Sequence, residues 1–190
     1  VSAVEFSPSG AKLAVGEFTG DSAAIYDIET LQRVAEVDCP HGVRAFAWMP
    51  NGSGLAVASK MHEILLWDVG TDHVTTKHGH SDSVLGLDIS SDGQWLVSAT
   101  HRDGLRIWSL DAARGATQRV DVGCRSATDR GSGHVSWTPD GGVLALPAAR
   151  SKTESWLVGA DDSQTQPGGC ERQWSAGGEA VAFYLGQEVV

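Results

Sequence analysis

Residues 79–108 read GHSDSVLGLDISSDGQWLVSATHRDGLRIW, and the rest of the chain repeats the plan of this segment. Residues 84–89 alternate large apolar side chains with small or polar ones, which is typical of a β-strand with one buried face. The turn at 90–93 follows, because Asp92 can bond its own backbone and Gly93 can adopt a positive φ. Three more strands are expected at residues 94–100, 105–110 and 117–122. The segment therefore predicts one sheet of four antiparallel strands.

Further copies of this plan lie on both sides of the segment. Each copy contains a Gly-ending turn that begins at an apolar residue, at 6–10, 48–52, 89–93 and 137–141. An aromatic residue closes the third strand of each copy, and these residues are Tyr26, Trp67, Trp108 and Trp156. The first three lie 41 residues apart, and the last follows after 48. Residues 174–183 align without gaps on 137–146, which indicates the start of a fifth copy.

The repeated unit resembles the WD40 family over essentially the whole chain. A period of about 40 to 45 residues, with Gly-His at the start and an aromatic residue at the end, is typical of that family's blades. The resemblance implies an all-β fold, a WD40-type β-propeller of four-stranded antiparallel blades. It also implies a buried hydrogen-bond network of His, Ser, Asp and Trp. The matching residues are His80, Ser98, Asp103 and Trp108, with Trp67 and Trp156 at the closing position of their own units; Asp103 comes one position late, because Arg102 stands where the family has Asp.

We predict about four and a half blades, with unit boundaries near 1–38, 39–78, 79–123, 124–166 and an incomplete 167–190. Since propellers use about four to eight blades, and most WD40 rings have more than four, the chain is expected to form an incomplete ring. A single blade exposes apolar residues on both faces, so each unit needs its neighbours for stability.

Composition and charge restrict the classes of function. The formal net charge is −10 and the acidic residues are dispersed, which disfavours direct binding of nucleic acid. The longest apolar stretches are the length of strands, far below the ~18 residues of a membrane-spanning helix. The three cysteines are far apart and form no Cys-x-x-Cys pair, so we expect reduced thiols, as in a cytosolic or nuclear protein.

The sequence carries no motif for catalysis. Neither Gly-x-Ser-x-Gly nor Gly-x-x-x-x-Gly-Lys occurs, which argues against a nucleophilic serine and a phosphate-binding loop. His73, His78 and His80 could hold zinc, but each has a simpler place in the repeat. Asp161-Asp162 lies in a polar stretch typical of a solvated turn. We therefore expect no enzyme activity, cofactor or metal, with a propeller enzyme as the remaining alternative.

Partners are expected at the loops of one rim, where side chains vary without disturbing the packing of the blades. These loops are 38–42, 78–83 and 123–133, with the turns at 17–22, 60–63, 101–104 and 148–153. Arginine is frequent at interface hot spots. Four arginines in these loops are our predicted partner contacts: Arg102, Arg125, Arg130 and Arg150.

These observations favour a non-enzymatic protein-interaction scaffold in a multiprotein intracellular assembly. Within the family, the order and lengths of the units resemble those of a nucleoporin, through stretches such as 12–15, 25–27, 170–172 and 183–187. That resemblance implies a nuclear pore component at the nuclear envelope or in the cytoplasm. Its partners would be other proteins of a large complex, without direct nucleic acid or small-molecule substrate, and any membrane association would run through a partner. A WD40 adaptor of a replication or chromatin complex is the alternative.

Overall fold

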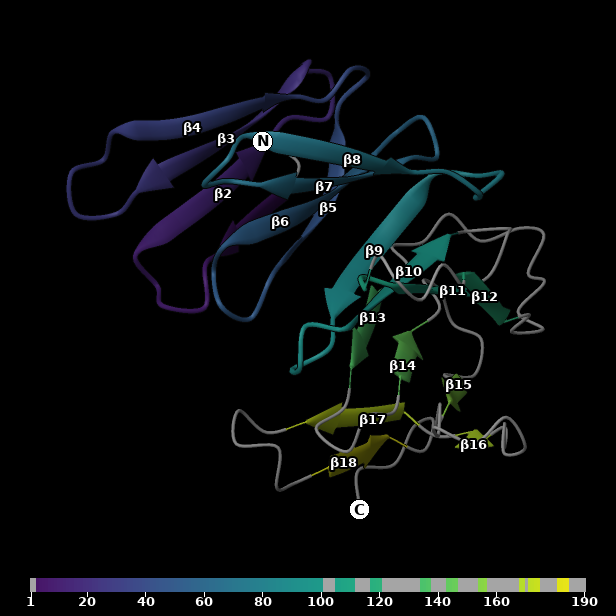
Figure 1. Ribbon diagram of the computed structural model, residues 1–190. Helices are drawn as coiled ribbons and strands as arrows, with labels where there is room; N and C mark the ends of the chain where they lie inside the picture. Colours follow the sequence, from purple (N-terminus) through teal and green to yellow (C-terminus); the bar gives the residue numbers. More distant parts are fainter. Residues whose placement is uncertain are drawn as a thin grey trace.

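The computed structural model describes residues 3–100 and 105–111, and beyond them seven short strands between residues 117 and 184. Every regular element in this described part is a strand. The strands form four sheets of four strands and one pair (Figure 1). Within each sheet the strand order follows the chain, and neighbouring strands are antiparallel.

The bounds of the strands in the first two sheets repeat closely. The first sheet contains β1 (Ala3–Phe6), β2 (Lys12–Gly16), β3 (Ser22–Asp27) and β4 (Arg33–Asp38). The second contains β5 (Val43–Trp48), β6 (Gly54–Ser59), β7 (Ile64–Asp68) and β8 (His73–Lys77).

The remaining sheets continue the same order. The third contains β9 (Val84–Ile89), β10 (Trp95–Thr100), β11 (Leu105–Ser109) and β12 (Thr117–Val120). The fourth contains β13 (His134–Trp137), β14 (Val143–Leu146), β15 (Glu154–Trp156) and β16 (Gly168–Gly169). The last two strands, β17 (Glu171–Trp174) and β18 (Val181–Tyr184), pair with each other.

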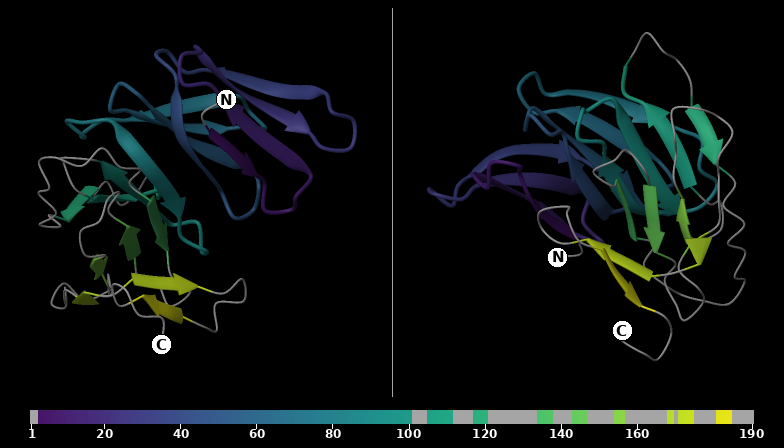
Figure 2. Two further views of the ribbon diagram at one scale, coloured as in Figure 1. Left: turned by 180° about the vertical axis from the view of Figure 1, so that it is seen from behind. Right: turned by 90° about the horizontal axis from the view of Figure 1, so that it is seen from below.

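Successive sheets follow one another along an arc, as the three views together show (Figures 1 and 2). The first strand of each sheet lies beside the first strand of the next, so that β1 contacts β5, β5 contacts β9 and β9 contacts β13. The predicted all-β architecture of four-stranded antiparallel blades is confirmed. We call β1, β5, β9 and β13 the inner strands.

The turn after each inner strand has the same geometry in the first three blades. Gly10, Gly52 and Gly93 have φ values of 73°, 70° and 70°. The N–H of each glycine donates to the carbonyl oxygen three residues earlier at 2.8 Å. Glycine is the residue that adopts this left-handed conformation without strain, so the repeated turn in the sequence sets the repeated hairpin.

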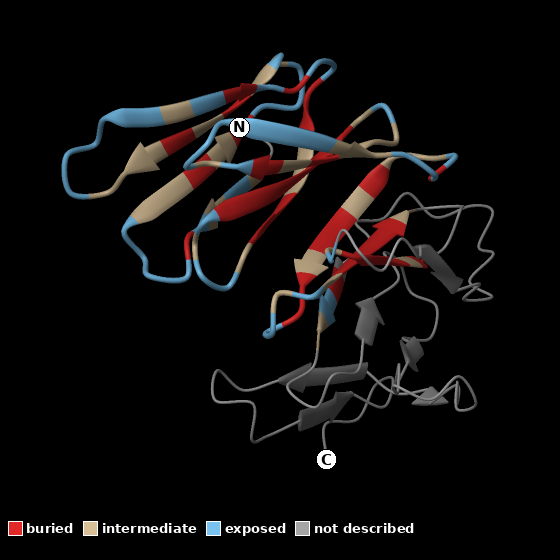
Figure 3. Cartoon of the chain, viewed as in Figure 1, coloured by how far each residue is buried: buried red, intermediate tan, exposed pale blue. Residues whose placement is uncertain are grey.

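The hydrophobic core lies between the sheets (Figure 3). One cluster joins the first two blades and includes Ile25, Phe46 and Trp67, and a second joins blades two and three through Ile64 and Leu96. All six residues of β6 are buried, whereas the first three residues of β8 are exposed. Burial therefore decreases toward the outer strand of this blade, and each blade is stabilised by the apolar area it shares with the next.

Candidate functional site

A buried polar network occupies the third blade. The hydroxyl of Ser98 on β10 accepts a hydrogen bond from the indole N–H of Trp108 on β11 at 2.8 Å. The same hydroxyl oxygen lies 2.6 Å from Nε2 of His80, which precedes β9. The His80 and Trp108 rings meet edge to face, with centroids 5.7 Å apart. All three side chains are buried, so the network joins three segments of one blade. Asp103, the fourth predicted member, lies outside the described residues.

The second blade replaces this network by apolar packing. Cys39, Val57 and Trp67 have the same spacing in the chain as His80, Ser98 and Trp108, and Cys39 and Val57 are fully buried. Val57 cannot accept a hydrogen bond, and the indole N–H of Trp67 donates instead to Oδ1 of Asp72 at 3.0 Å. Burial, together with the charge of Glu63, raises the pKa of the Cys39 thiol to about 11. Cys39 is therefore a neutral, free thiol at neutral pH.

The fourth blade differs in register. Trp67 lies opposite Leu55, and Trp108 lies opposite Leu96. Both leucines are the seventh residue after the first residue of the Gly-ending turn in their blade. In the fourth blade the residue in that position is Leu144, and its partner is Ser155. Trp156 lies opposite Val143. The backbone thus places Trp156 one residue away from the register of the other two tryptophans.

Two carboxylates on the inner strands contact the next blade. Glu5 on β1 accepts a hydrogen bond from the backbone N–H of Trp48, and its carbonyl oxygen accepts the Trp48 indole N–H at 3.2 Å. Asp88 on β9 repeats both contacts: Oδ2 accepts the backbone N–H of Trp137 at 2.6 Å, and its carbonyl oxygen accepts the Trp137 indole at 3.1 Å. The hydroxyl of Ser136 also donates to Oδ2, at 3.0 Å. One carboxylate–tryptophan pair therefore links blade one to two and another links three to four.

Both carboxyl groups have raised pKa values. Burial, and then the negative charge of Asp88, raise the pKa of Glu5 to about 7, although the bond from the Trp48 backbone lowers it. Burial also raises the pKa of Asp88, against the lowering effect of its bonds to Trp137, Ser136 and Ile89. Such shifts can mark an acid–base site. Here each carboxylate accepts from a backbone N–H of the next blade, and Asp88 also accepts from the Ser136 hydroxyl and from its own neighbour Ile89. The described residues contain no cluster of metal ligands.

Glu5 and Asp88 are not among the residues predicted from the sequence. The available signal was their shared repeat position, since each directly precedes the first residue of the Gly-ending turn. The other two inner strands have Ala47 and Ser136 in that place.

Loops from three blades are tied together at one rim. The N–H of Val43 donates to the carbonyl oxygen of Glu17 at 2.8 Å, and the N–H of Lys60 donates to that of Gly42 at 3.2 Å. The hydroxyl of Ser83 donates to the carbonyl oxygen of Lys60 at 3.1 Å. Four of the predicted rim segments, at 17–22, 38–42, 60–63 and 78–83, are therefore brought together.

An aromatic ring with two cations projects from this rim. Phe18 follows β2 and is 41% exposed. The guanidinium carbon of Arg44 lies 4.4 Å from the centroid of its ring, and Nζ of Lys60 lies 3.8 Å from it. Met61, next to Lys60, is 52% exposed. The rim thus offers apolar surface and positive charge side by side, at a place to which residues from two blades contribute.

The four predicted contact arginines, Arg102, Arg125, Arg130 and Arg150, lie outside the described residues. Arg44 is not among the predicted contacts because it lies inside a strand, and Lys60 is included only within the predicted rim turn 60–63.

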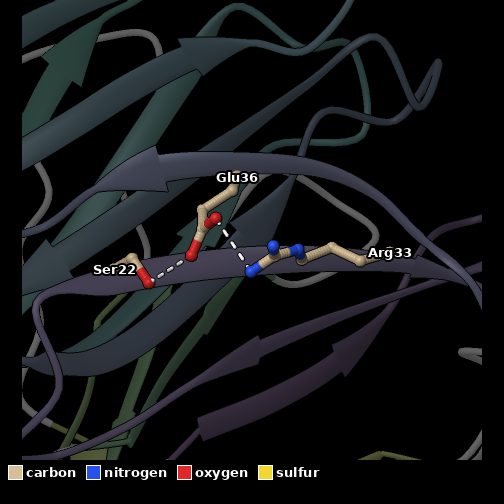
Figure 4. Close-up of polar contacts among 3 residues, drawn as sticks. All are labelled: Ser22, Arg33 and Glu36. Carbon is tan, nitrogen blue, oxygen red and sulfur yellow. Dashed lines mark hydrogen bonds and ion pairs between the residues drawn. The ribbon is translucent and has the colours of Figure 1, made fainter.

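A different polar cluster lies on the outer edge of the first blade. Glu36 on β4 accepts from the hydroxyl of Ser22 at 2.7 Å and pairs with Arg33 at 2.9 Å (Figure 4). Because both charged side chains are largely exposed, this pair adds little stability. Arg33 is thus an exposed arginine outside the rim segments.

No helix in the described part of the chain is long and apolar enough to cross a bilayer.

Comparison with known proteins supports the interpretation of the repeat. Residues 71–109 match the family described as WD domain, G-beta repeat. The chain is 32% identical over 120 residues to human Echinoderm microtubule-associated protein-like 3, covering 60% of the chain and 13% of that protein. It is 25% identical over 160 residues to Transcription initiation factor TFIID subunit 5 of Caenorhabditis elegans, covering 77% of the chain and 24% of that protein.

Among solved structures, hydrazine synthase from Kuenenia stuttgartiensis superposes with a TM-score of 0.72 at 18% identity, over 96% of the chain and 54% of that protein's chain. At this identity the likeness concerns the fold alone. The chain thus spans about half of this solved chain and a quarter or less of the two relatives. Residues 71–109, which contain the end of the second blade and most of the third, therefore form a WD40 repeat in a β-propeller-type array of blades.

Proposed function

We propose that this protein is a non-enzymatic scaffold whose rim binds other proteins of a multiprotein assembly. The observation that carries the proposal is the rim itself, where loops of three blades are joined by hydrogen bonds and present Phe18, Met61 and two cations to solvent. A surface held in one conformation loses little entropy when a partner binds, so such a rim is suited to recognition.

A propeller enzyme is less well supported. The two carboxyl groups with raised pKa values, Glu5 and Asp88, accept hydrogen bonds from the adjacent blade, and this contact explains their position without a substrate. The shared fold with hydrazine synthase does not transfer its activity, because one fold supports many functions.

The sequence suggests two alternatives for the assembly in which this scaffold acts. The first is an aladin-like nuclear pore component located at the nuclear envelope or in the cytoplasm. The second is an adaptor of a replication or chromatin complex, and the similarity to a TFIID subunit favours an assembly of this nuclear kind. The unit boundaries near 1–38, 39–78, 79–123, 124–166 and 167–190 belong to the same proposal.

Affinity purification of the full-length protein from its native cells, followed by mass spectrometry, tests the scaffold. We expect a reproducible set of proteins that belong to one complex. Nuclear pore proteins in this set would favour the first alternative, and transcription, replication or chromatin proteins would favour the second. Recovery of no specific protein would contradict the scaffold proposal.

The predicted contact arginines are tested in the same experiment. Charge reversal of Arg125 and Arg130 together should release part of the set. Arg33→Glu on the outer edge of the first blade is the matched control and should leave the set unchanged, since Arg33 lies outside the rim segments.

A further inference from the structure

Four neighbouring residues of the rim combine apolar surface with positive charge, and we call them the Phe18 patch: Phe18, Arg44, Lys60 and Met61. Phe18 comes from the first blade and the other three come from the second. Both cations lie within 4.4 Å of the centre of the Phe18 ring, so they hold their charge beside its apolar surface. Phe18 and Met61 remain 41% and 52% exposed.

The positive charge of the patch is not neutralised within the described part of the chain. Neither Arg44 nor Lys60 forms an ion pair there. Glu63, the carboxylate of the same turn as Lys60, pairs instead with His78, with 3.3 Å between Oε1 and Nδ1. The chain as a whole carries a formal charge of −10, so these two cations, which form no ion pair among the described residues, are opposite in sign to its net charge.

The side chain of Arg44 is partly exposed, although its Nε atom is buried and has no acceptor in the described structure. An arginine guanidinium has five N–H donors in a planar fork that fits a carboxylate. The ring contact with Phe18 supplies only an attraction to π electrons, so the terminal N–H groups of Arg44, unlike the buried Nε, remain available to an anionic ligand.

The backbone beneath the patch is held firmly. The hydrogen bond from Val43 to Glu17 and the one from Lys60 to Gly42 hold the turns 17–22 and 60–63 against the start of β5. Gly42, at a φ of 92°, packs so closely that a Cβ at this position would collide with the backbone oxygen of Phe18. The four side chains therefore start from a backbone already arranged for binding.

We propose that the Phe18 patch binds an acidic peptide segment of a partner protein. In this complex, carboxylate side chains of the segment contact Arg44 and Lys60, and a neighbouring apolar side chain packs on the exposed parts of Phe18 and Met61. The inference rests on the proposed scaffold function, for which it names the chemistry of the partner. A short peptide with a few carboxylates fits better than a nucleic acid, because a nucleic acid carries a charge on every phosphate and would be repelled far more strongly by the acidic remainder of the chain.

The first test selects peptides from a phage-displayed library of random 12-residue sequences on the immobilised full-length protein. We expect the selected peptides to be enriched in Asp and Glu next to Leu, Ile or Phe. Their binding is then measured by fluorescence polarisation as synthetic, labelled peptides. Replacement of their Asp and Glu by Asn and Gln should weaken binding at least about fivefold, the effect of one lost ion pair of about 1 kcal/mol.

Variants of the protein locate the binding site. Lys60→Gln and Arg44→Gln should each weaken the acidic peptides about fivefold, and Phe18→Ala should weaken them at least as much. Arg33→Gln removes the same charge from β4 and should have no effect. Since Phe18→Ala could loosen the rim, unfolding temperatures are compared, and Lys60→Gln, which removes only a charged end group, carries the conclusion if the Phe18 variant is unstable.

Three results would overturn the proposal: selection of no peptides or of peptides without acidic enrichment, binding that is unchanged in the Lys60 and Arg44 variants, or patch-dependent binding of labelled oligo(U) in place of peptides. Purification from native cells with the Lys60→Gln/Arg44→Gln protein separates this inference from the scaffold proposal. If the wild-type and variant proteins recover the same partners, the scaffold stands and the patch is wrong. If the wild type recovers none, the scaffold itself fails.

Discussion

At the scale of single residues, two tryptophans at the same repeat position find different acceptors. The indole of Trp108 donates to the buried hydroxyl of Ser98, whereas the indole of Trp67 donates to Asp72, which is exposed. A hydrogen bond in the interior has no water to replace a lost partner. The two bonds are alike in length but differ in what their loss should cost.

Ser98→Ala should lower the free energy of unfolding by about 2 to 4 kcal/mol, because it leaves both Trp108 and His80 without the shared hydroxyl in a buried site. Asp72→Gly is the matched change. It should alter stability by at most about 0.5 kcal/mol, since water can replace the carboxylate and Gly suits the φ of 57° at this position. Denaturant unfolding of both variants measures the difference. Equal losses would contradict the assigned roles.

Glu5 should make stability depend on pH. Its pKa is raised from 4.5 to about 7 in the folded protein, so the folded state keeps a proton that the unfolded chain has already released in this window. The stability associated with Glu5 is therefore fully present below pH 4.5 and is lost as the pH rises through about 7. Glu5→Gln stays neutral and its amide oxygen can still accept from Trp48. The variant should lose less stability than wild type between pH 5 and 8 in denaturant unfolding.

Asp88→Asn tests the electrostatic interaction between Asp88 and Glu5. The negative charge of Asp88 contributes to the raised pKa of Glu5, so its removal should move that pKa downward and reduce the pH dependence. Titration of the Glu5 carboxyl by NMR checks the direction. An unchanged midpoint would show that burial alone controls the group.

At the scale of elements, the joints between neighbouring blades are not uniform. Glu5–Trp48 links the first joint and Asp88–Trp137 the third. At the second joint, Ala47 and Ile89 stand in the equivalent places, and the contact is apolar. The first joint also carries the tight packing of Gly42 against Phe18.

Gly42→Ala should therefore destabilise the first joint strongly. The new methyl group must adopt a φ of 92° and displace the Phe18 backbone, which we expect to cost about 4 kcal/mol in all. Gly52→Ala has a similar left-handed φ of 70° but no atom within 4 Å of the added carbon, and should cost only about 1 kcal/mol. Thermal unfolding compares the two. Similar losses of stability in the two variants would mean that the rim backbone yields to the added methyl group and is not held firmly.

At the scale of the whole molecule, one face of the first blade is apolar and open. Val4 and Phe6 on β1 are each 60% exposed, whereas Phe46 and Trp48, at the same repeat positions of β5, are only 5% and 6% exposed. An apolar face of this kind promotes association between molecules.

We expect the 190-residue chain to self-associate through this face. The double variant Val4→Thr/Phe6→Ser should reduce the association seen by sedimentation velocity while changing the unfolding free energy by about 0.5 kcal/mol or less, since the side chains are largely exposed. Leu31→Asn, which removes an apolar group that is 74% exposed in the turn between β3 and β4, is the control and should leave association as in wild type. Equal association in all three proteins would contradict the prediction.

Local pattern was enough to identify the blades. Alternating apolar residues in strands such as 84–89 and the glycines at positions 10, 52 and 93 act within a few residues, and the structure realises them as predicted. The same logic did not reach the fourth blade, where Trp156 lies one residue out of register. Its distance along the chain from Leu144 equals that of Trp108 from Leu96, so the sequence gives no sign of the shift. It also did not find the polar joints.

The sequence by itself determined that this chain repeats one four-stranded unit, because strand alternation and turn chemistry are local properties of the residues. Only the tertiary structure decided which residues of different blades meet: Glu5 with Trp48, Asp88 with Trp137, and Phe18 with Arg44 and Lys60. These partners are about 26 to 49 residues apart in the chain, and their contacts depend on how one blade stacks on the next. No local pattern encodes that geometry, because it follows from burying the apolar faces of neighbouring blades against each other.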